Sequence, residues 1–122
     1  VGKMVIESMW SVSQYAGDFN PFHIHEGQLS GVCYLRVPPS LPAEYAKEDH
    51  YPTVGDICWF NGQAATFSGH KHQESPKVGD IFLFPNWLAH GVYPFRTPNE
   101  ERRSVSFNLH LIKKDEPQPL DN

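Results

Sequence analysis

The sequence predicts a single all-β domain, in which short strands form a closed barrel or a two-sheet sandwich. Runs of apolar and aromatic residues alternate with Pro, Gly and Asn along the whole chain of 122 residues. About eight short strands separated by turn residues are typical of closed or sandwiched β folds. No window keeps a long apolar period of 3.6 residues, which excludes a helical domain. The length suits one domain with one core.

The expected strands follow one another at short spacing. They are residues 4–12, 22–25, 29–37, 56–60, 64–68, 80–84, 91–95 and 104–112. One helix of at most two turns is expected at residues 42–48, with Ser40 or Leu41 ahead of it. We therefore expect a domain at residues 1–112 and a polar, Pro-containing tail at residues 113–122, and we expect the tail to fray.

Two segments of the chain have similar sequences, and the similarity is called the echo below. Residues 52–61 resemble residues 76–86, since in each a Pro and a Gly-Asp pair lead into a hydrophobic run that ends at Asn. Gly suits a turn that needs a positive φ, and Asp can bond back to the backbone. Two ordinary β-turns would explain the echo. We favour two equivalent strand starts in a jelly roll, because the motifs described below agree with that fold.

The charge and the cysteine content limit which binding partners and which cellular compartment we expect. Ten basic and fourteen acidic side chains give a net charge of −4, so we expect no nucleic-acid or membrane partner. The apolar runs are too short to span a bilayer, and because they include no secretory h-region we expect no secretory signal. Cys33 and Cys58 each lie in an apolar stretch, which favours buried thiols over a disulfide and indicates a reducing, cytoplasmic compartment. The sequence leaves open whether the protein forms a homodimer.

A histidine pair and a distant third histidine form the strongest candidate site. His23 and His25 are two residues apart, so on a strand both rings point to the same side. His90 on a facing strand would complete a three-ligand set with open coordination positions. Imidazole suits iron, zinc, copper or nickel, so the ligand type alone does not choose the metal.

The other histidines are weaker candidates. His70 and His72 stand among loop-forming residues, and His50 lies beside a Tyr-Pro pair. We interpret these three as solvated loop residues outside the metal site. His110 has inward parity in the last strand but no evident partner, which is typical of a structural residue.

The last strand has one polar and one mostly apolar face. Its polar face carries Arg102, Ser104, Ser106 and Asn108, while Arg103 begins the other face. An outer strand with one face in water would show the same alternation. If the polar face looks into the barrel, Arg102 and Ser104 can hold a carboxylate, because a guanidinium binds it bidentately and a hydroxyl adds a further donor.

Four blocks together resemble a known family. They are His23-Ile24-His25, residues 29–35 (LSGVCYL), residues 79–90 (GDIFLFPNWLAH) and residues 102–108 (RRSVSFN). In this order they are similar to the HxH, the LSGVYYL-like strand, the FPSWLxH-like block and the RxSxSFN ending of the putative 2-oxoglutarate/Fe(II) oxygenase family of marine bacteria and phages. The resemblance runs from about Trp10 to Asn108 and implies a cupin-like double-stranded β-helix, or jelly roll.

The resemblance implies an iron site and an Fe(II)/2-oxoglutarate-dependent dioxygenase of hydroxylase type. It places His23, His25 and His90 around Fe(II), and it names no catalytic residue beyond these metal ligands. His25 occupies the position that usually holds an Asp or Glu ligand. The implied site is therefore one negative charge short.

The resemblance also implies a site for the cosubstrate 2-oxoglutarate. Arg102 and Ser104 would hold its far carboxylate, and Tyr34 and Asn108 would line the pocket. Two alternatives stay open: a cupin-type three-His metal protein that needs no 2-oxoglutarate, and a non-catalytic binding module on the same barrel. The substrate, a small molecule or a peptide, depends on loops at residues 38–53, 68–77 and 96–101, which carry no transferable code.

Overall fold

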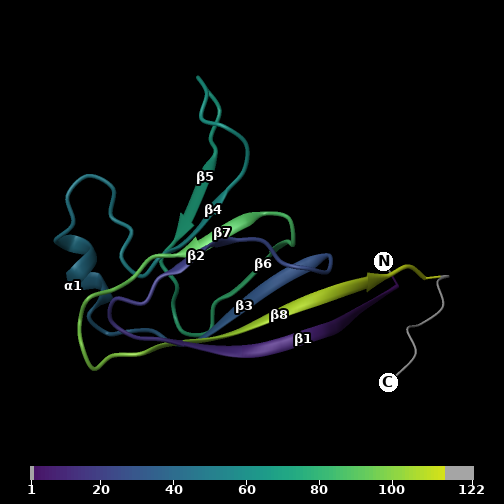
Figure 1. Ribbon diagram of the computed structural model, residues 1–122, viewed down its shortest axis with the longest axis horizontal. Helices are drawn as coiled ribbons and strands as arrows, with labels where there is room; N and C mark the ends of the chain where they lie inside the picture. Colours follow the sequence, from purple (N-terminus) through teal and green to yellow (C-terminus); the bar gives the residue numbers. More distant parts are fainter. Residues whose placement is uncertain (1, 115–122) are drawn as a thin grey trace.

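Two four-stranded antiparallel sheets pack face to face in the computed structural model, which describes residues 2–114 (Figure 1). The larger sheet has the order β1 (Lys3–Gln14), β8 (Arg102–Ile112), β3 (Leu29–Arg36) and β6 (Ile81–Pro85). The smaller sheet has the order β2 (Asn20–His23), β7 (Ala89–Val92), β4 (Ile57–Phe60) and β5 (Lys71–Glu74). One short helix, α1 (Leu41–Ala46), follows β3. The predicted all-β jelly roll is confirmed.

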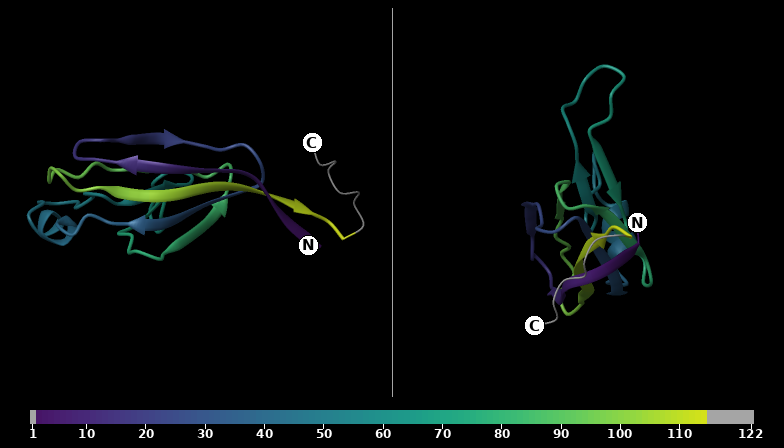
Figure 2. Two further views of the ribbon diagram at one scale, coloured as in Figure 1. Left: turned by 90° about the horizontal axis from the view of Figure 1, so that it is seen from below. Right: turned by 90° about the vertical axis from the view of Figure 1, so that its right-hand side faces the viewer.

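The core lies between the two sheets because alternate residues of each strand point inward. Val32 and Tyr34 of β3 face Ile57 and Trp59 of β4, and Phe84 and Val92 complete a cluster whose members are all at most 7 % exposed. Burying side chains of this size stabilises a fold by about 1.5–3 kcal/mol each. Figure 2 shows β1 and β8 running on together beyond this core, where Lys3 pairs with Ile112.

The echoed segments form equivalent turns, as the sequence predicts. The Asp56 N–H donates to the carbonyl of Thr53 (2.9 Å) before β4, and the Asp80 N–H donates to the carbonyl of Lys77 (3.0 Å) before β6. Gly55 and Gly79 precede these aspartates with φ of 70° and 92°. Both values lie in the left-handed region that Gly adopts without strain.

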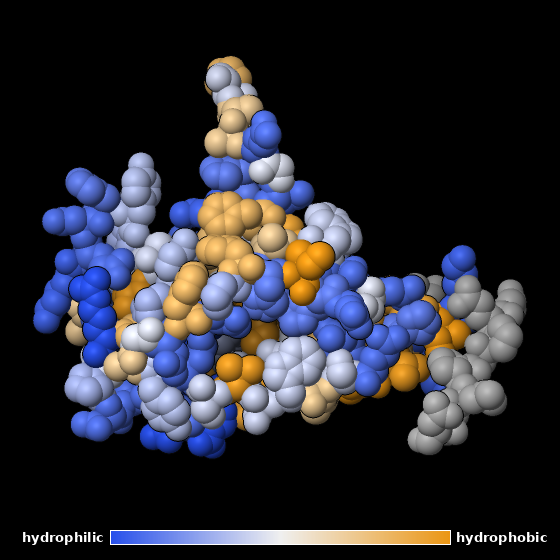
Figure 3. Space-filling view, viewed as in Figure 1, coloured by the Kyte–Doolittle hydropathy of each residue, from blue (hydrophilic) through white to orange (hydrophobic). Residues whose placement is uncertain are grey.

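The fifth strand lies further along the chain than expected, and the prediction of a strand at residues 64–68 is wrong. Residues 61–70 instead form the arm of a hairpin that projects from the body, and an isolated bridge joins Ala65 to Ser68 (Figure 1). The strand itself is Lys71–Glu74, a polar sequence at the edge of the smaller sheet. His72 therefore lies in a strand rather than in the expected loop. In Figure 3 apolar groups gather at the base of this hairpin and reappear at its tip.

The remaining expectations differ from the structure by a few residues at element ends. Both cysteines are free thiols, with Cys58 buried and Cys33 half-buried. No helix in residues 2–114 is long and apolar enough to cross a membrane. The predicted tail at residues 113–122 lies, from residue 115 onward, outside the described residues.

Candidate functional site

The structure brings His23, His25 and His90 together. His23 ends β2 and lies directly opposite His90 of β7, and His25 follows two residues after His23. Each ring offers a nitrogen, and the three nitrogens all lie within 4.8 Å of one another. Nε2 of His25 is 2.9 Å from Nε2 of His90. The convergence predicted from the spacing is therefore present in the fold.

Two of the three rings are held in the tautomer that a metal ion requires. Nδ1 of His23 donates to the carbonyl of Pro21 (2.6 Å), and Nδ1 of His90 donates to the carbonyl of Leu88 (3.0 Å). A carbonyl only accepts, so Nδ1 carries the proton and Nε2 keeps its lone pair. Ligands at right angles with bonds of about 2.1 Å stand about 3.0 Å apart, which agrees with the 2.9 Å separation of His25 and His90. The donor set fits a divalent transition metal.

Two of the rings, those of His25 and His90, stay neutral near pH 7. Burial, and then the neighbouring His23 and His25, lower the pKa of His90 to about 4. Burial lowers the pKa of His25 as well, with His23 adding to the effect. Neutral imidazole is the form that binds metal. Among the described residues, the cluster consists of three imidazoles and contains no carboxylate.

Arg102 is a buried cation with an unused donor. Its side chain is 2 % exposed. Nη1 donates to the Gly55 carbonyl (2.7 Å) and Nη2 to the Tyr34 hydroxyl (2.6 Å), whereas Nε has no partner. Burial lowers the pKa of Arg102, and Tyr34 and Asp56 oppose that shift. Within residues 2–114 no carboxylate forms an ion pair with it. A guanidinium in this setting favours an anionic ligand.

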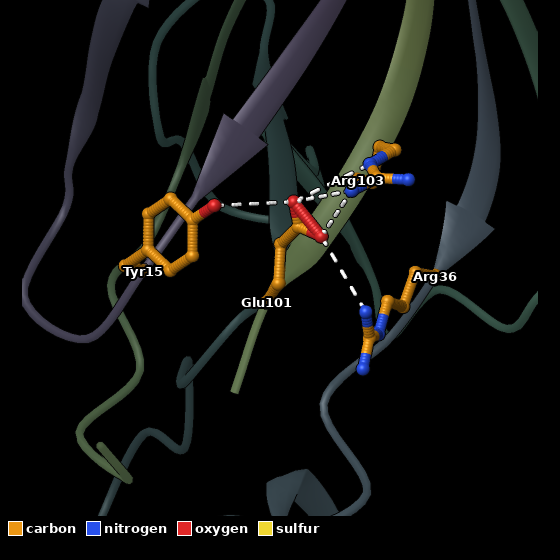
Figure 4. Close-up of polar contacts among 4 residues, drawn as sticks. All are labelled: Tyr15, Arg36, Glu101 and Arg103. Carbon is orange, nitrogen blue, oxygen red and sulfur yellow. Dashed lines mark hydrogen bonds and ion pairs between the residues drawn. The ribbon is translucent and has the colours of Figure 1, made fainter. Parts of the chain in front are cut away.

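The residue before Arg102 fixes the start of β8. Figure 4 shows the carboxylate of Glu101 between Tyr15, Arg36 and Arg103. Arg103 donates to it at 2.7 Å, the Tyr15 hydroxyl donates at 3.3 Å, and Arg36 lies 3.6 Å away. Arg103 itself is about half exposed, so it lies on the opposite face of β8 from Arg102. Sequence analysis missed Glu101, because three separate segments supply its partners.

One cavity connects the histidines with the arginine. It holds about 60 Å³ and is lined by all three histidines, by Arg102 and Ser104, and by Tyr34. Tyr34 lies directly opposite Ser104 in the pairing of β3 with β8. The volume accommodates about two water molecules, so a larger ligand needs side chains to move aside. Trp10, whose ring stacks on His25 at 5.7 Å, is the most exposed aromatic side chain of the lining.

Asn108 lies apart from this cavity lining. Its amide donates to the Ser8 hydroxyl (3.1 Å) and accepts from the Ser30 hydroxyl (3.3 Å). A contact between Asn108 and a cosubstrate stays a prediction. His70 and His72 are outside the three-histidine cluster.

Comparison with known protein families assigns the chain to one family. The model of a family described as "Putative 2OG-Fe(II) oxygenase" matches residues 8–108. The chain belongs to this family. The matched range includes the three histidines, Arg102 and Ser104, so the residues that line the cavity lie within it. No match is found among curated proteins.

Proposed function

We propose that the protein is an Fe(II)- and 2-oxoglutarate-dependent oxygenase of hydroxylase type. The observation that carries this proposal is the pairing of two features in one cavity: three convergent imidazoles, and a buried guanidinium with a free N–H. 2-Oxoglutarate is a dianion with a carboxylate at each end. Its keto-acid end suits a metal ion, and its far carboxylate suits an arginine.

Each residue then has a defined task. His23, His25 and His90 would hold Fe(II), and Arg102 with Ser104 would hold the far carboxylate of 2-oxoglutarate. The Tyr34 hydroxyl accepts from Nη2 of Arg102, which fixes the plane of the guanidinium. Iron and 2-oxoglutarate, when bound, supply the activation of oxygen for insertion into a C–H bond. Apolar walls such as Val32 and Phe84 keep water away from the reacting groups.

Because no carboxylate is among the metal-binding residues, the binding of Fe(II) and the binding of 2-oxoglutarate should be coupled. Three neutral donors leave both positive charges of Fe(II) uncompensated, and the keto-acid end of 2-oxoglutarate is the anion that neutralises them. We therefore expect Fe(II) to bind more tightly in the presence of 2-oxoglutarate, and by thermodynamic linkage the reverse also holds.

The test is an anaerobic titration. Fe(II) is added to the protein and then 2-oxoglutarate, and the visible charge-transfer band of the ternary complex is recorded. Arg102→Ala should weaken 2-oxoglutarate binding by about 2–4 kcal/mol, which is about 30- to 1000-fold. Arg102→Lys should restore only part of the affinity, because an ammonium lacks the planar fork.

Arg103→Ala is the matched control, since Arg103 is the next residue and faces outward. Equal affinities in the Arg102→Ala and Arg103→Ala variants would refute the assignment of the carboxylate site. Metal binding that 2-oxoglutarate does not alter would instead favour a three-histidine metal protein without this cosubstrate.

A further inference from the structure

A row of aromatic side chains leads from the metal site to an edge of the smaller sheet. His23 lies opposite His90, His90 lies opposite Trp59, and Trp59 lies opposite His72. Residues directly opposite in paired strands point to the same face, and neighbouring strands are about 4.8 Å apart. Trp59 is therefore one strand away from the ligand His90, and His72 is two strands away.

Two adjoining hollows meet at this row. One of 390 Å³ lies at the base of the β4–β5 hairpin and includes His70 and Trp87, and the other of 380 Å³ lies between β5 and β6. Trp59, His72 and Leu88 line both of them. Within the described chain, β5 pairs only with β4, and β6 only with β3. The hollows thus lie beside two sheet edges whose backbone groups have no strand partner on that side.

An unsatisfied donor lies between the hollows. Trp59 is 6 % exposed, and its indole N–H has no hydrogen-bond partner. The His72 ring lies 5.6 Å from the indole and is itself bonded to Glu74 at 2.8 Å, with most of its side chain in solvent. A buried N–H without an acceptor is uncommon in proteins. Displacing the exposed His72 ring would open the indole to a ligand acceptor.

One aromatic ring is shared by the metal cavity and the hollow beside β6. Phe84 lines both the hollow beside β6 and the cavity that holds the three histidines. Its ring is 4.6 Å from that of His90 and 5.6 Å from that of Trp59. A rotation of Phe84 would let a group bound over Trp59 reach the metal centre.

We propose that the groove formed by the two hollows, between β5 and β6, binds an extended peptide. In an extended chain, side chains two residues apart point to the same side. Two such side chains would occupy the hollows, and the backbone carbonyl between them would accept the Trp59 N–H. Peptides laid beside sheet edges use this combination of backbone hydrogen bonds and side-chain pockets. That this peptide is also the oxygenase substrate rests on the proposed function.

The test uses the metal-free protein, so it does not depend on oxygenase chemistry. A displayed library of 12-residue peptides is selected on the wild-type protein, and the most enriched peptide is synthesised. Trp59→Phe keeps an apolar ring and removes only the indole donor. We expect it to weaken binding of that peptide at least tenfold, while Tyr51→Phe, which removes an exposed hydroxyl donor outside the groove, leaves the affinity unchanged.

A measurement on the unmutated protein guards against misfolding of Trp59→Phe. The indole ¹⁵N–¹H resonance of Trp59 should move downfield when the peptide binds, and enriched peptides should share apolar residues two positions apart. No enrichment, equal binding by Trp59→Phe, or a Trp59 resonance that does not move would each overturn the proposal. The anaerobic titration reports separately on the oxygenase assignment, so either idea can fail without the other.

Discussion

Replacing Tyr34 by Phe tests whether the fold holds Arg102 ready for an anion. The substitution deletes one hydroxyl, which accepts a 2.6 Å hydrogen bond from Arg102. Tyr34 is 1 % exposed and Arg102 is 2 % exposed, so the lost acceptor belongs to a buried pair that bulk solvent does not reach. Hydrogen bonds to charged groups contribute about 1.5–3 kcal/mol. We expect the free energy of unfolding to fall by that amount.

Urea denaturation at pH 7 measures this effect. A loss of about 2 kcal/mol lowers the urea midpoint by about 1 M, because the slope for a small domain is about 1–3 kcal/mol per molar. Tyr51→Phe is the matched control, since Tyr51 is 83 % exposed, and it should leave the midpoint in place. Burial raises the pKa of Tyr34, and Arg102 offsets only part of this rise. The Tyr34 hydroxyl therefore keeps its proton throughout the assay.

A double variant separates this bond from general damage to the core. Arg102→Met removes the guanidinium, and in that background Tyr34→Phe no longer strands a buried cation. Replacing both partners of a hydrogen bond by apolar groups of similar shape is close to neutral. We expect the double variant to be more stable, by about 1 kcal/mol or more, than the sum of the single effects predicts. Additive effects, or a Tyr34→Phe loss below about 0.5 kcal/mol, would refute the reasoning.

Three further predictions address the metal, the start of β8 and access to the cavity. His25→Asp should keep Fe(II) at least as tightly as the wild type, and His25→Ala should weaken it, as measured by competition with a chelator; unchanged affinity in the latter would remove His25 from the ligand set. Burial tends to raise the pKa of Glu101. The hydrogen bonds from Arg103, together with smaller contributions, outweigh burial and lower this pKa below 4.5. The ionised Glu101 carboxylate thus stabilises the fold above pH 4.5, and this effect is lost as the pH falls through the pKa of Glu101 in the folded protein. Urea unfolding at pH 7 and pH 3 should therefore show a smaller pH dependence of stability for Glu101→Gln than for the wild type. Trp10→Ala should speed 2-oxoglutarate association in stopped-flow absorbance, whereas Met9→Ala, on the outer face of β1, should not.

The sequence predicts the site better than it predicts the strands. His23 and His25 are separated by one residue, and an extended segment predicts that their rings point to the same side, although β2 ends at His23 and His25 follows it. The same parity turns Arg102 and Ser104 inward together, and the structure buries both. These relations are local, so they do not depend on which strands pair. His90 is different, because only the pairing of β2 with β7 places it opposite His23.

Features that depend on several distant segments are not readable from the sequence. β5 consists of Lys71, His72, Gln73 and Glu74, and none of these residue types favours a strand. It forms because Trp59 and its neighbours in β4 pair with it from one side. The carboxylate of Glu101 likewise has partners from three places: Tyr15 just after β1, Arg36 of β3 and Arg103 of β8. A single sequence contains no signal for such combinations.

The distribution of charge in the cavity explains why the two ends of the site are built so differently. The metal end has three imidazole rings, and burial keeps His90 and His25 from becoming cations that would repel the ion. The other end has one guanidinium, whose free Nε lacks a protein acceptor. With Fe(II) bound, both ends would be positive. Among the described residues no carboxylate forms an ion pair with Arg102, and Asp56 acts on it only from a longer distance. On the proposed function, a dianionic keto acid would neutralise both ends at once, so we expect it to bind more tightly than a monoanion that could satisfy only one.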